Sequence, residues 1–460
     1  MGNEFKAVSG ATIAAVSTPQ GEGGIGVIRI SGEDAIAVAD KCFRSFSGEK
    51  LSEIGGYSAL YGRVFEGDEP LDEAVALLFR APKSYTGEDV VELSVHGGRL
   101  MVKAVLRTVL SCGAKLADAG EFSKRAFLNG KMDLAKAESI MGLISAQNDL
   151  SLKISRAAKS GRISREIDTV IENLLETAAS LSVYADYPDE DIEGLSFDRF
   201  CAMLGDCLLK LERLVSNYDA GRVIREGIDC AIVGKPNVGK STLMNLLVGS
   251  ERSIVTDVAG TTRDIIEENV TVGGVVLRLA DTAGIHETDD TVERVGVARA
   301  KQRIDNAGLI LAVFDASCGL DEDDIKLLES LKGRACIVIL NKTDKGNIVD
   351  KSVFDGFECV ECCAKEGAGV KELSDAVAKV TKIECLDPDT AVLISERQRD
   401  CAVKAKFAVE EALVALRAGV TLDAVGVCID DALSALLELT GKRVTNEVSD
   451  EVFRRFCVGK

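Results

Sequence analysis

The chain has 460 residues, of which 46% are hydrophobic, and its formal net charge is −19. A chain of this length exceeds what one hydrophobic core usually serves, so two or three domains are expected, and no apolar run reaches the roughly 18 residues of a membrane span. The acidic charge should repel nucleic acid at long range, so any RNA contact would need a local basic patch.

The fourteen cysteines are scattered along the chain and do not make the pair of Cys-x-x-Cys motifs that zinc sites use. The start, MGNEFKAVSG, has no basic segment followed by an apolar one, so a secretory signal is not expected. Reduced thiols in the cytoplasm fit this pattern better than a disulfide framework or a zinc site. We therefore expect a cytoplasmic protein that does not enter a membrane.

The first part of the chain shows short apolar runs separated by glycine-rich turns. These runs are TIAAVS, GVIRIS, AVALLF and VVELSV, and at least two helices lie among them. Residues rich in Val and Ile that are bounded by turn residues indicate strands. We predict an α+β domain over residues 1–126.

Two long tracts lack proline, one from Lys83 to Tyr187 and the other from Asp389 to the end. The second half of the first tract and the whole of the second have apolar residues at intervals of three and four, which predicts helices. The segment between them instead alternates short apolar runs with helical or turn-rich stretches, which indicates a mostly parallel sheet. We predict a helical domain in two parts, residues 127–225 and 387–460, with an α/β domain inserted at 226–386.

The inserted domain contains a phosphate-loop motif. Residues 234–241, GKPNVGKS, follow an apolar strand and precede the helical TLMNLLVG, as the pattern G-x-x-x-x-G-K-S/T requires. Backbone N–H groups of such a loop surround the β-phosphate. Lys240 would bridge the β- and γ-phosphates and Ser241 would ligate Mg²⁺. A glycine-rich turn without a nucleotide is the alternative that this motif alone leaves open.

Three further motifs occur in the order that a guanine-nucleotide site needs. Asp281-Thr282-Ala283-Gly284 follows a strand, where Asp281 can hold Mg²⁺ through water. Asn341-Lys342-Thr343-Asp344 ends another strand, and Asp344 can accept the N1–H and 2-amino hydrogens of guanine. Gly260-Thr261-Thr262-Arg263-Asp264 lies where a switch threonine belongs. The four motifs together indicate a Ras-like GTPase domain.

One position departs from Ras-type enzymes. They place a water-positioning Gln after the D-x-x-G motif, whereas Ile285 follows Gly284 here. An aliphatic side chain cannot orient a water molecule. Either this GTPase uses another device or it binds GTP and rarely hydrolyses it.

With these motifs, the chain resembles the MnmE (TrmE) tRNA-modification GTPase family over essentially its whole length. The resemblance rests on the inserted GTPase domain and on TIAAVSTPQGEGGIGVIRISG, SYTGEDVVELSVHGG, GEFSKRAFLNGKMDLAKAESI and the terminal CVGK. It implies a K⁺-dependent GTPase that acts on tRNA. With an FAD-dependent MnmG partner, it would install a (carboxymethyl)aminomethyl group at C5 of the wobble uridine, using a tetrahydrofolate such as 5-formyltetrahydrofolate as one-carbon donor. The alternative is a ribosome-assembly or regulatory GTPase without modification chemistry.

The resemblance also implies a homodimer, a heterotetramer with the MnmG-type subunit, and a potassium ion in place of an arginine finger. A cation there would neutralise charge that develops between the β- and γ-phosphates. The positions that match potassium ligands are Asn237, Thr256, Val258 and Thr261. Thr262 matches the switch ligand of Mg²⁺, and Glu293 matches an acidic residue that orients the attacking water. By its residue type alone, Glu293 would be a solvated helix carboxylate.

A larger set of residues is expected around GTP and its metal ions. It comprises Asn237, Val238, Gly239, Lys240, Ser241, Thr242, Thr256, Asp257, Val258, Ala259, Gly260, Thr261, Thr262, Asp281, Thr282, Ala283, Gly284, Asn341, Lys342, Asp344, Ala364 and Lys365. The family's Ser-Ala-Lys/Arg motif reads Cys363-Ala364-Lys365 here. The amide of Ala364 could still meet guanine O6, so we expect little change.

In the N-terminal domain, the resemblance implies folate binding and dimerisation. Arg29, Glu92, Lys131 and Lys460 match positions that contact the folate ligand. A glutamyl tail suits cations and a pterin ring suits a carboxylate. His96 has two interpretations, a role at the ligand site or a structural role in a turn.

Cys457, in the terminal CVGK, has three interpretations. It could be a buried structural thiol, a prenylation site, or a thiol at the modification site. The terminal Lys460 does not fit prenylation. A thiol whose pKa is lowered beside a lysine would be nucleophilic, and the resemblance favours a place in the active site, with its chemical role open.

Overall fold

The computed structural model describes residues 10–19, 21–186, 196–250, 267–280, 305, 307–387 and 389–459. The chain forms two compact units, one of residues 1–141 with 433–460 and the other of residues 142–432. Helices α4 (Leu134–Ile144) and α13 (Leu422–Thr440) each contain the boundary between these units. The four-part division predicted above remains a prediction.

The first unit is built on one mostly antiparallel sheet with the strand order β3-β4-β5-β6-β2-β1-β7. Its strands are β1 (Ile13–Val16), β2 (Ile25–Ser31), β3 (Phe43–Ser45), β4 (Ser58–Glu66), β5 (Glu69–Phe79), β6 (Val90–His96) and β7 (Lys115–Leu116). Its helices are α1 (Ala35–Cys42), η1 (Leu51–Glu53), α2 (Arg99–Ser111), α3 (Glu121–Leu128) and α14 (Asn446–Arg454). The four predicted strands are present as β1, β2, β5 and β6.

Helices α1 and α2 bury one face of this sheet. In β4 the buried residues alternate with exposed ones, as a sheet with one wet face requires. Val102, Val105 and Val109 of α2, at helical spacing, join the same core as Ile28 and Leu93 of the strands. The opposite side of the sheet therefore remains available for polar and aromatic side chains.

The C-terminal segment belongs to the first unit. Phe453 and Phe456 of the α14 region pack with Phe127 and Leu134, with ring centroids of Phe127 and Phe453 6.0 Å apart. This small aromatic core joins the end of the chain to residues more than 300 positions earlier. Burying these rings stabilises the position of everything that follows α14.

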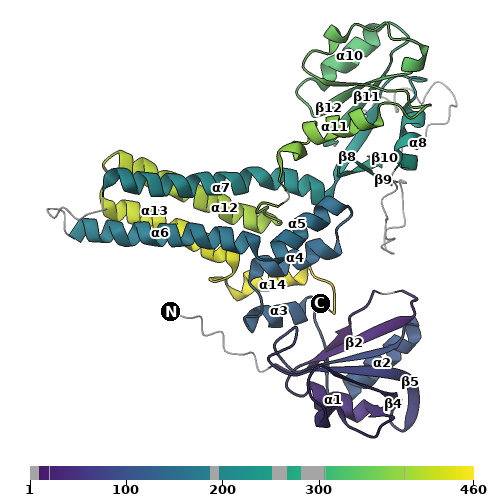
Figure 1. Ribbon diagram of the computed structural model, residues 1–460, viewed down its shortest axis with the longest axis vertical. Helices are drawn as coiled ribbons and strands as arrows, with labels where there is room; N and C mark the ends of the chain where they lie inside the picture. Colours follow the sequence, from purple (N-terminus) through teal and green to yellow (C-terminus); the bar gives the residue numbers. More distant parts are fainter. Residues whose placement is uncertain are drawn as a thin grey trace. The chain divides into compact units, whose positions relative to one another are not determined.

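The second unit contains long helices and a second sheet. Its helices include α5 (Asp149–Lys159), α6 (Arg162–Asp186), α7 (Phe197–Glu226) and α12 (Glu396–Arg417). Helices α6, α7 and α12 lie side by side (Figure 1), and α7 contacts both of the others. Ser196 caps the start of α7 by accepting the Arg199 N–H, and Gly227, with φ of 75°, follows its end.

The second sheet has the strand order β13-β12-β11-β8-β10-β9, and all its pairings are parallel except that of β9 with β10. Its strands are β8 (Ile228–Val233), β9 (Glu267–Val272), β10 (Val275–Ala280), β11 (Leu309–Asp315), β12 (Cys336–Asn341) and β13 (Glu358–Glu361). The helical segments around it are α8 (Lys240–Ser250), α10 (Glu322–Leu331), η2 (Thr343–Lys345), η3 (Lys351–Phe354), α11 (Val370–Val380) and η4 (Ile383–Cys385).

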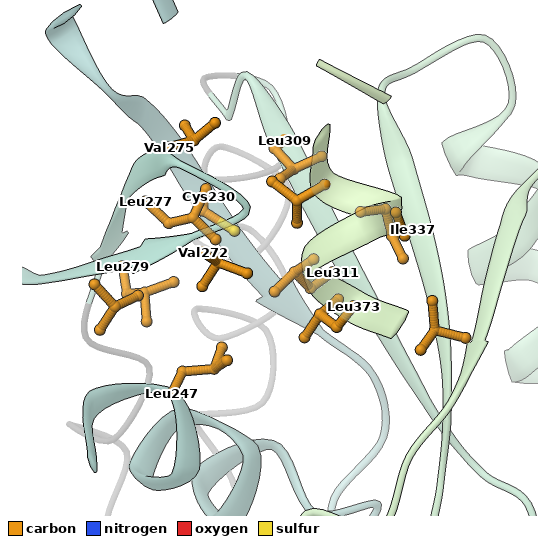
Figure 2. Packing of buried hydrophobic residues seen from close by; sticks show 14 of the residues in the cluster. Cys230, Leu247, Val272, Val275, Leu277, Leu279, Leu309, Leu311, Ile337 and Leu373 are labelled. Atoms are coloured by element: carbon orange, nitrogen blue, oxygen red, sulfur yellow. The ribbon is translucent and has the colours of Figure 1, made fainter. Parts of the chain in front are cut away.

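Strand β11 is buried on both faces, which explains its continuous apolar sequence. Leu309 and Leu311 face the core that contains Leu373 of α11 and Leu247 of α8 (Figure 2). Ile310 and Phe314 face a second core with Leu328 of α10. Helices on both faces of a parallel sheet are the arrangement that the strand–helix alternation predicted.

The structure confirms the predicted fold class, with an α+β N-terminal part, a helical part interrupted in sequence, and an inserted α/β part with a phosphate loop. Among the described residues, no helix is long and apolar enough to cross a membrane.

Candidate functional site

The phosphate loop connects β8 to α8, and two of its glycines are needed for close packing. Gly234 has φ of 143°, and a Cβ placed there would lie 2.3 Å from the Val313 carbonyl oxygen. Gly239 has φ of 101°, and a Cβ there would lie 2.2 Å from Asn341 Nδ2. Any other residue would push the loop away from the sheet or from the motif that reads the base. The sequence pattern G-x-x-x-x-G is therefore enforced by contacts with β11 and β12.

Lys240 lies across this loop. Its Nζ donates to the carbonyl oxygens of Gly234 and Lys235, at 2.8 and 2.6 Å. Partial burial lowers the pKa of the Lys240 amine, because desolvation disfavours the charged form. Phosphate oxygens are stronger acceptors than these carbonyls, so the amine is placed to exchange them for a nucleotide. Ser241 and Thr242, which follow it, are exposed in the first turn of α8.

Asn341 joins three loops through one buried amide. It is 3% exposed, its Nδ2 donates to the Val238 carbonyl at 2.9 Å, and its Oδ1 accepts the Ala364 N–H at 3.0 Å. The predicted residues Asn341, Val238 and Ala364 are therefore brought together by hydrogen bonds. The Ala364 amide, expected to face guanine, is bonded to Asn341 in the structure.

Lys342 links the ends of two neighbouring strands to the phosphate loop. Its Nζ donates to the Asn237 carbonyl at 2.5 Å and to Asp315 Oδ2 at 2.6 Å. Asp315 ends β11 opposite Asn341 of β12. Burial acts to raise the pKa of Asp315, but hydrogen bonds from Lys342 and Ser317 outweigh it and lower the pKa. Asp315 therefore stays charged and holds Lys342 against the loop.

Cys363 supports the carboxylate that the motif assigns to guanine. Its buried Sγ donates to Asp344 Oδ1 at 3.3 Å. A thiol is a weaker donor than a hydroxyl, so this contact is weaker than one that a serine at the same position would make. Lys365, two residues later, is exposed.

Part of the predicted site lies outside the described residues. These positions are Thr256, Asp257, Val258, Ala259, Gly260, Thr261, Thr262, Asp281, Thr282, Ala283, Gly284, Glu293 and Lys460. Of the expected metal ligands, Asn237 and Ser241 are described. Within the described ranges, no group of three or more His, Cys, Asp or Glu side chains could hold a metal ion.

An ion-pair cluster that the sequence does not indicate lies at the phosphate loop. Lys235, the second residue of the loop, pairs with Asp321 and with Asp324, whose Oδ2 lies 3.1 Å from its Nζ. Asp321 caps α10 by accepting the N–H groups of Asp323 and Asp324, and Asp324 is only 8% exposed. The acidic run at 321–324 indicates a helix start, but nothing local indicates its partner.

In the first unit, two of the predicted folate residues form a pair. Arg29 of β2 and Glu92 of β6 are in register, and Arg29 Nε lies 2.8 Å from Glu92 Oε1. The guanidinium carbon of Arg29 lies 5.3 Å from the ring centre of Tyr85 and 5.6 Å from that of Phe122. Aromatic faces attract a cation and fix its orientation. Lys131 donates to the Pro82 carbonyl at 2.9 Å, three residues before Tyr85.

The C-terminal tail is fixed beside β1. The Cys457 carbonyl accepts the Gly120 N–H at 3.3 Å, and the Ser17 hydroxyl donates to the Gly459 carbonyl at 3.0 Å. Gly459 has φ of 94°, and a Cβ there would lie 2.1 Å from the Val16 carbonyl oxygen. The Cys457 side chain is exposed, which contradicts the interpretation as a buried structural thiol.

His96 is paired with Asp72 of the neighbouring strand. Its Nδ1 lies 2.7 Å from Asp72 Oδ1, and its backbone N–H donates to Asp72 Oδ2 at 2.8 Å. The side-chain hydrogen bond with Asp72 raises the pKa of His96. Since His96 stands four residues beyond Glu92 on β6, these contacts support the structural interpretation.

Comparison with known proteins covers nearly the whole chain. The family model "MnmE helical domain" matches residues 134–457, and the model "GTP-binding protein TrmE N-terminus" matches residues 12–131. A protein named "tRNA modification GTPase MnmE" from Clostridioides difficile is 39% identical over 454 residues, which is 98% of this chain and 99% of the relative. One of the same name from Acetivibrio thermocellus is 40% identical over 459 residues, again 98% and 99%.

A solved structure of the G domain of the T. maritima FeoB iron transporter is 26% identical and covers 33% of this chain and 98% of that chain. Its TM-score is 0.26, which supports no inference about the fold.

We predict that Asp324→Asn weakens binding of both GTP and GDP. The pair with Lys235 holds the loop before any phosphate arrives, so its loss should weaken affinity about five- to tenfold and leave kcat nearly unchanged. The matched control is Asp323→Asn on the same helix, because Asp323 pairs with Lys326 instead. Equilibrium binding of a fluorescent guanine nucleotide measures the effect, and equal losses in the two variants would contradict the assigned role.

We also predict a pH-dependent contribution of His96 to stability. Because the folded-state pKa is raised, the stabilisation is complete below the ordinary histidine pKa of about 6.5 and is lost as pH rises through the raised value. Thermal unfolding of the unaltered chain and of His96→Asn should therefore differ most at acid pH and converge at alkaline pH. A difference that is constant with pH would refute this.

Proposed function

The chain belongs to the MnmE family of tRNA-modification GTPases, and we propose that it hydrolyses GTP with the help of K⁺ to modify wobble uridines. It is a GTP-hydrolysing enzyme of tRNA modification. The finer proposal is that, with an FAD-dependent MnmG-type partner, it adds a (carboxymethyl)aminomethyl group at C5 of the wobble uridine. A tetrahydrofolate would donate the one-carbon unit. The enzyme would work in the cytoplasm as a homodimer within a heterotetramer.

One observation carries the proposal of modification chemistry. The tail with exposed Cys457 ends beside β1, and Ala15 of that strand pairs in register with Arg29. Arg29 is in turn bonded to Glu92. A thiol, a cation and a carboxylate thus belong to one compact unit. A regulatory GTPase without modification chemistry has no need for this arrangement.

The residues of this unit fit a folate. Arg29 lies near two aromatic rings, and its guanidinium can bond a carboxylate or a pterin in addition to Glu92 or in its place. Glu92 can accept the N–H groups of a pterin ring, and Lys131 can meet the glutamyl carboxylates. When bound, the folate would supply the one-carbon unit. Arg29 and Glu92 would orient it, and Cys457 would belong to the same site.

The phosphate loop fits a monovalent cation beside the phosphates. Asn237 is exposed at the tip of the loop with φ of 64°, and Lys342 holds its backbone carbonyl. Its side-chain amide is therefore left to offer a neutral oxygen, a ligand that suits a weakly charged ion better than a carboxylate would. Asn237 would hold K⁺ and Ser241 would hold Mg²⁺, and these ions would neutralise charge on the phosphates. Thr256, Val258, Thr261 and Thr262 are the further proposed ligands, and Glu293 would orient water.

We predict that GTP hydrolysis is at least about tenfold faster in KCl than in NaCl, because a cation that fits between the phosphates stabilises the transition state. Asn237→Ala should abolish the difference and leave the rate in NaCl nearly unchanged. Asn347→Ala is the matched control, since Asn347 lies in the same domain and bonds Glu361. Phosphate release at constant ionic strength measures both. Equal rates in the two salts would exclude a potassium mechanism.

The proposed product is tested in cells that lack the gene. Nucleoside mass spectrometry of their tRNA should show wobble uridines without the C5 group, and the intact gene should restore it. Arg29→Gln should fail to restore it while the protein still hydrolyses GTP. Unaltered wobble uridines together with defective ribosomal subunits would replace this proposal by the ribosome-assembly alternative.

A further inference from the structure

One short segment of this acidic chain is strongly basic. Residues 150–165, LSLKISRAAKSGRISR, contain five cationic side chains and no Asp or Glu, whereas the whole chain has a net charge of −19. The cations stand at every third position, Lys153, Arg156, Lys159, Arg162 and Arg165. We call these five residues the α5–α6 basic surface.

These side chains lie around the turn between α5 and α6, where all are exposed except Arg162, which is half-buried. In α5, Ile154, Ser155 and Ala158 are buried, so the cations between them face outward. Gly161, with φ of 81°, donates its N–H to the Ala158 carbonyl and turns the chain into α6. The Arg165 guanidinium donates to the Ser160 carbonyl at 3.0 Å, which draws it toward the turn.

Most of these cations have no carboxylate to neutralise them. Lys153 lies 3.3 Å from Asp389, and both side chains are more than half exposed. Within the described part of the chain, no carboxylate lies in ion-pair distance of the other four. Three other cations of this unit, Lys326, Lys351 and Lys379, are each paired with a carboxylate. The surface thus keeps its positive field in an otherwise acidic protein.

The helix dipoles explain only part of this charge. Arg162 and Arg165 stand in the first turn of α6, where no acidic residue is present and the helix dipole disfavours cations. Arg156 and Lys159 stand in the last turn of α5, where that helix dipole favours cations, so the dipole accounts for two of the five charges. The cations at the start of α6 oppose the stability of that helix, so we expect them to bind a negatively charged ligand.

We propose that the α5–α6 basic surface docks the sugar–phosphate backbone of tRNA, an inference that rests on the proposed function in tRNA modification. Regularly spaced Lys and Arg side chains neutralise phosphates and position a nucleic acid without reading its sequence. Lys153 and Lys159 are six helical residues apart, which is about 9 Å along the axis, so several phosphates can be contacted at once. A membrane is disfavoured because the apolar face of α5 is already buried around Ile154.

Binding of the full-length protein to fluorescent tRNA over a series of salt concentrations tests this. The variant R156Q/K159Q/R162Q removes three cations from the surface. The control K326Q/K351Q/K379Q removes three paired cations of the same unit, so its change in net charge equals that of the surface variant. The surface variant should bind at least about tenfold more weakly, and its slope of log K against log salt should fall by about 2 to 3. The control should bind as the unaltered chain does.

Several results would overturn the proposal. They are no measurable tRNA binding by the unaltered chain, equal losses in the two variants, or binding of polyglutamate or anionic vesicles as tight as that of tRNA. GTP hydrolysis without tRNA should be unchanged in both variants. If the triple variant loses helix content, R156Q/K159Q within α5 replaces it, with an expected change in slope of about 2.

The outcome is separable from that of the proposed function. If the surface variant loses tRNA binding but wobble uridines are normal in cells that lack the gene, the docking surface is supported and the modification chemistry is refuted. Normal tRNA binding by the surface variant, alongside gene-dependent wobble uridines, would refute the docking surface alone.

Discussion

The nucleotide site depends on the buried amide of Asn341, whose two ends are bonded to Val238 of the phosphate loop and Ala364 of the base-side loop. A buried amide that finds both partners stabilises the fold, and one left unpaired would cost about 1–3 kcal/mol. Gly239 has no side chain because the Asn341 amide occupies that space. The phosphate and base motifs are thus parts of one packed structure, which is why their order in the sequence carries so much information.

The parallel sheet supplies the frame for this contact. Strands β8, β11 and β12 end at the same edge, so the phosphate loop, Asp315 and Asn341 meet there. Charge pairs then hold the loop from two sides, with Lys342 between Asn237 and Asp315, and Lys235 against α10. The loop is therefore held in place before a nucleotide arrives, which lowers the entropy lost on binding.

In the first unit, the end of the chain packs against residues near its beginning. The aromatic core of Phe127, Phe453 and Phe456 and the glycine contacts of the tail fix Cys457 beside β1. The basic surface on α5 and α6 belongs to the other unit. The net negative charge of the protein repels the phosphates of tRNA, and the positive charge of this surface would offset that repulsion locally.

The sequence by itself determined the GTPase motifs, the fold class and the family, because each motif is a contiguous run whose backbone geometry is set by its own glycines and flanking strand. It also showed four strands of the first sheet. Strands β3 and β7 are too short to be recognised from the sequence, and in β4 polar residues interrupt the apolar ones. Only the tertiary structure decided that Lys235 meets Asp324, that Cys363 bonds Asp344 and that four of the five α5–α6 cations have no carboxylate partner among the described residues. Such contacts join residues distant in sequence, and they depend on strand order and helix packing, which local residue patterns do not encode.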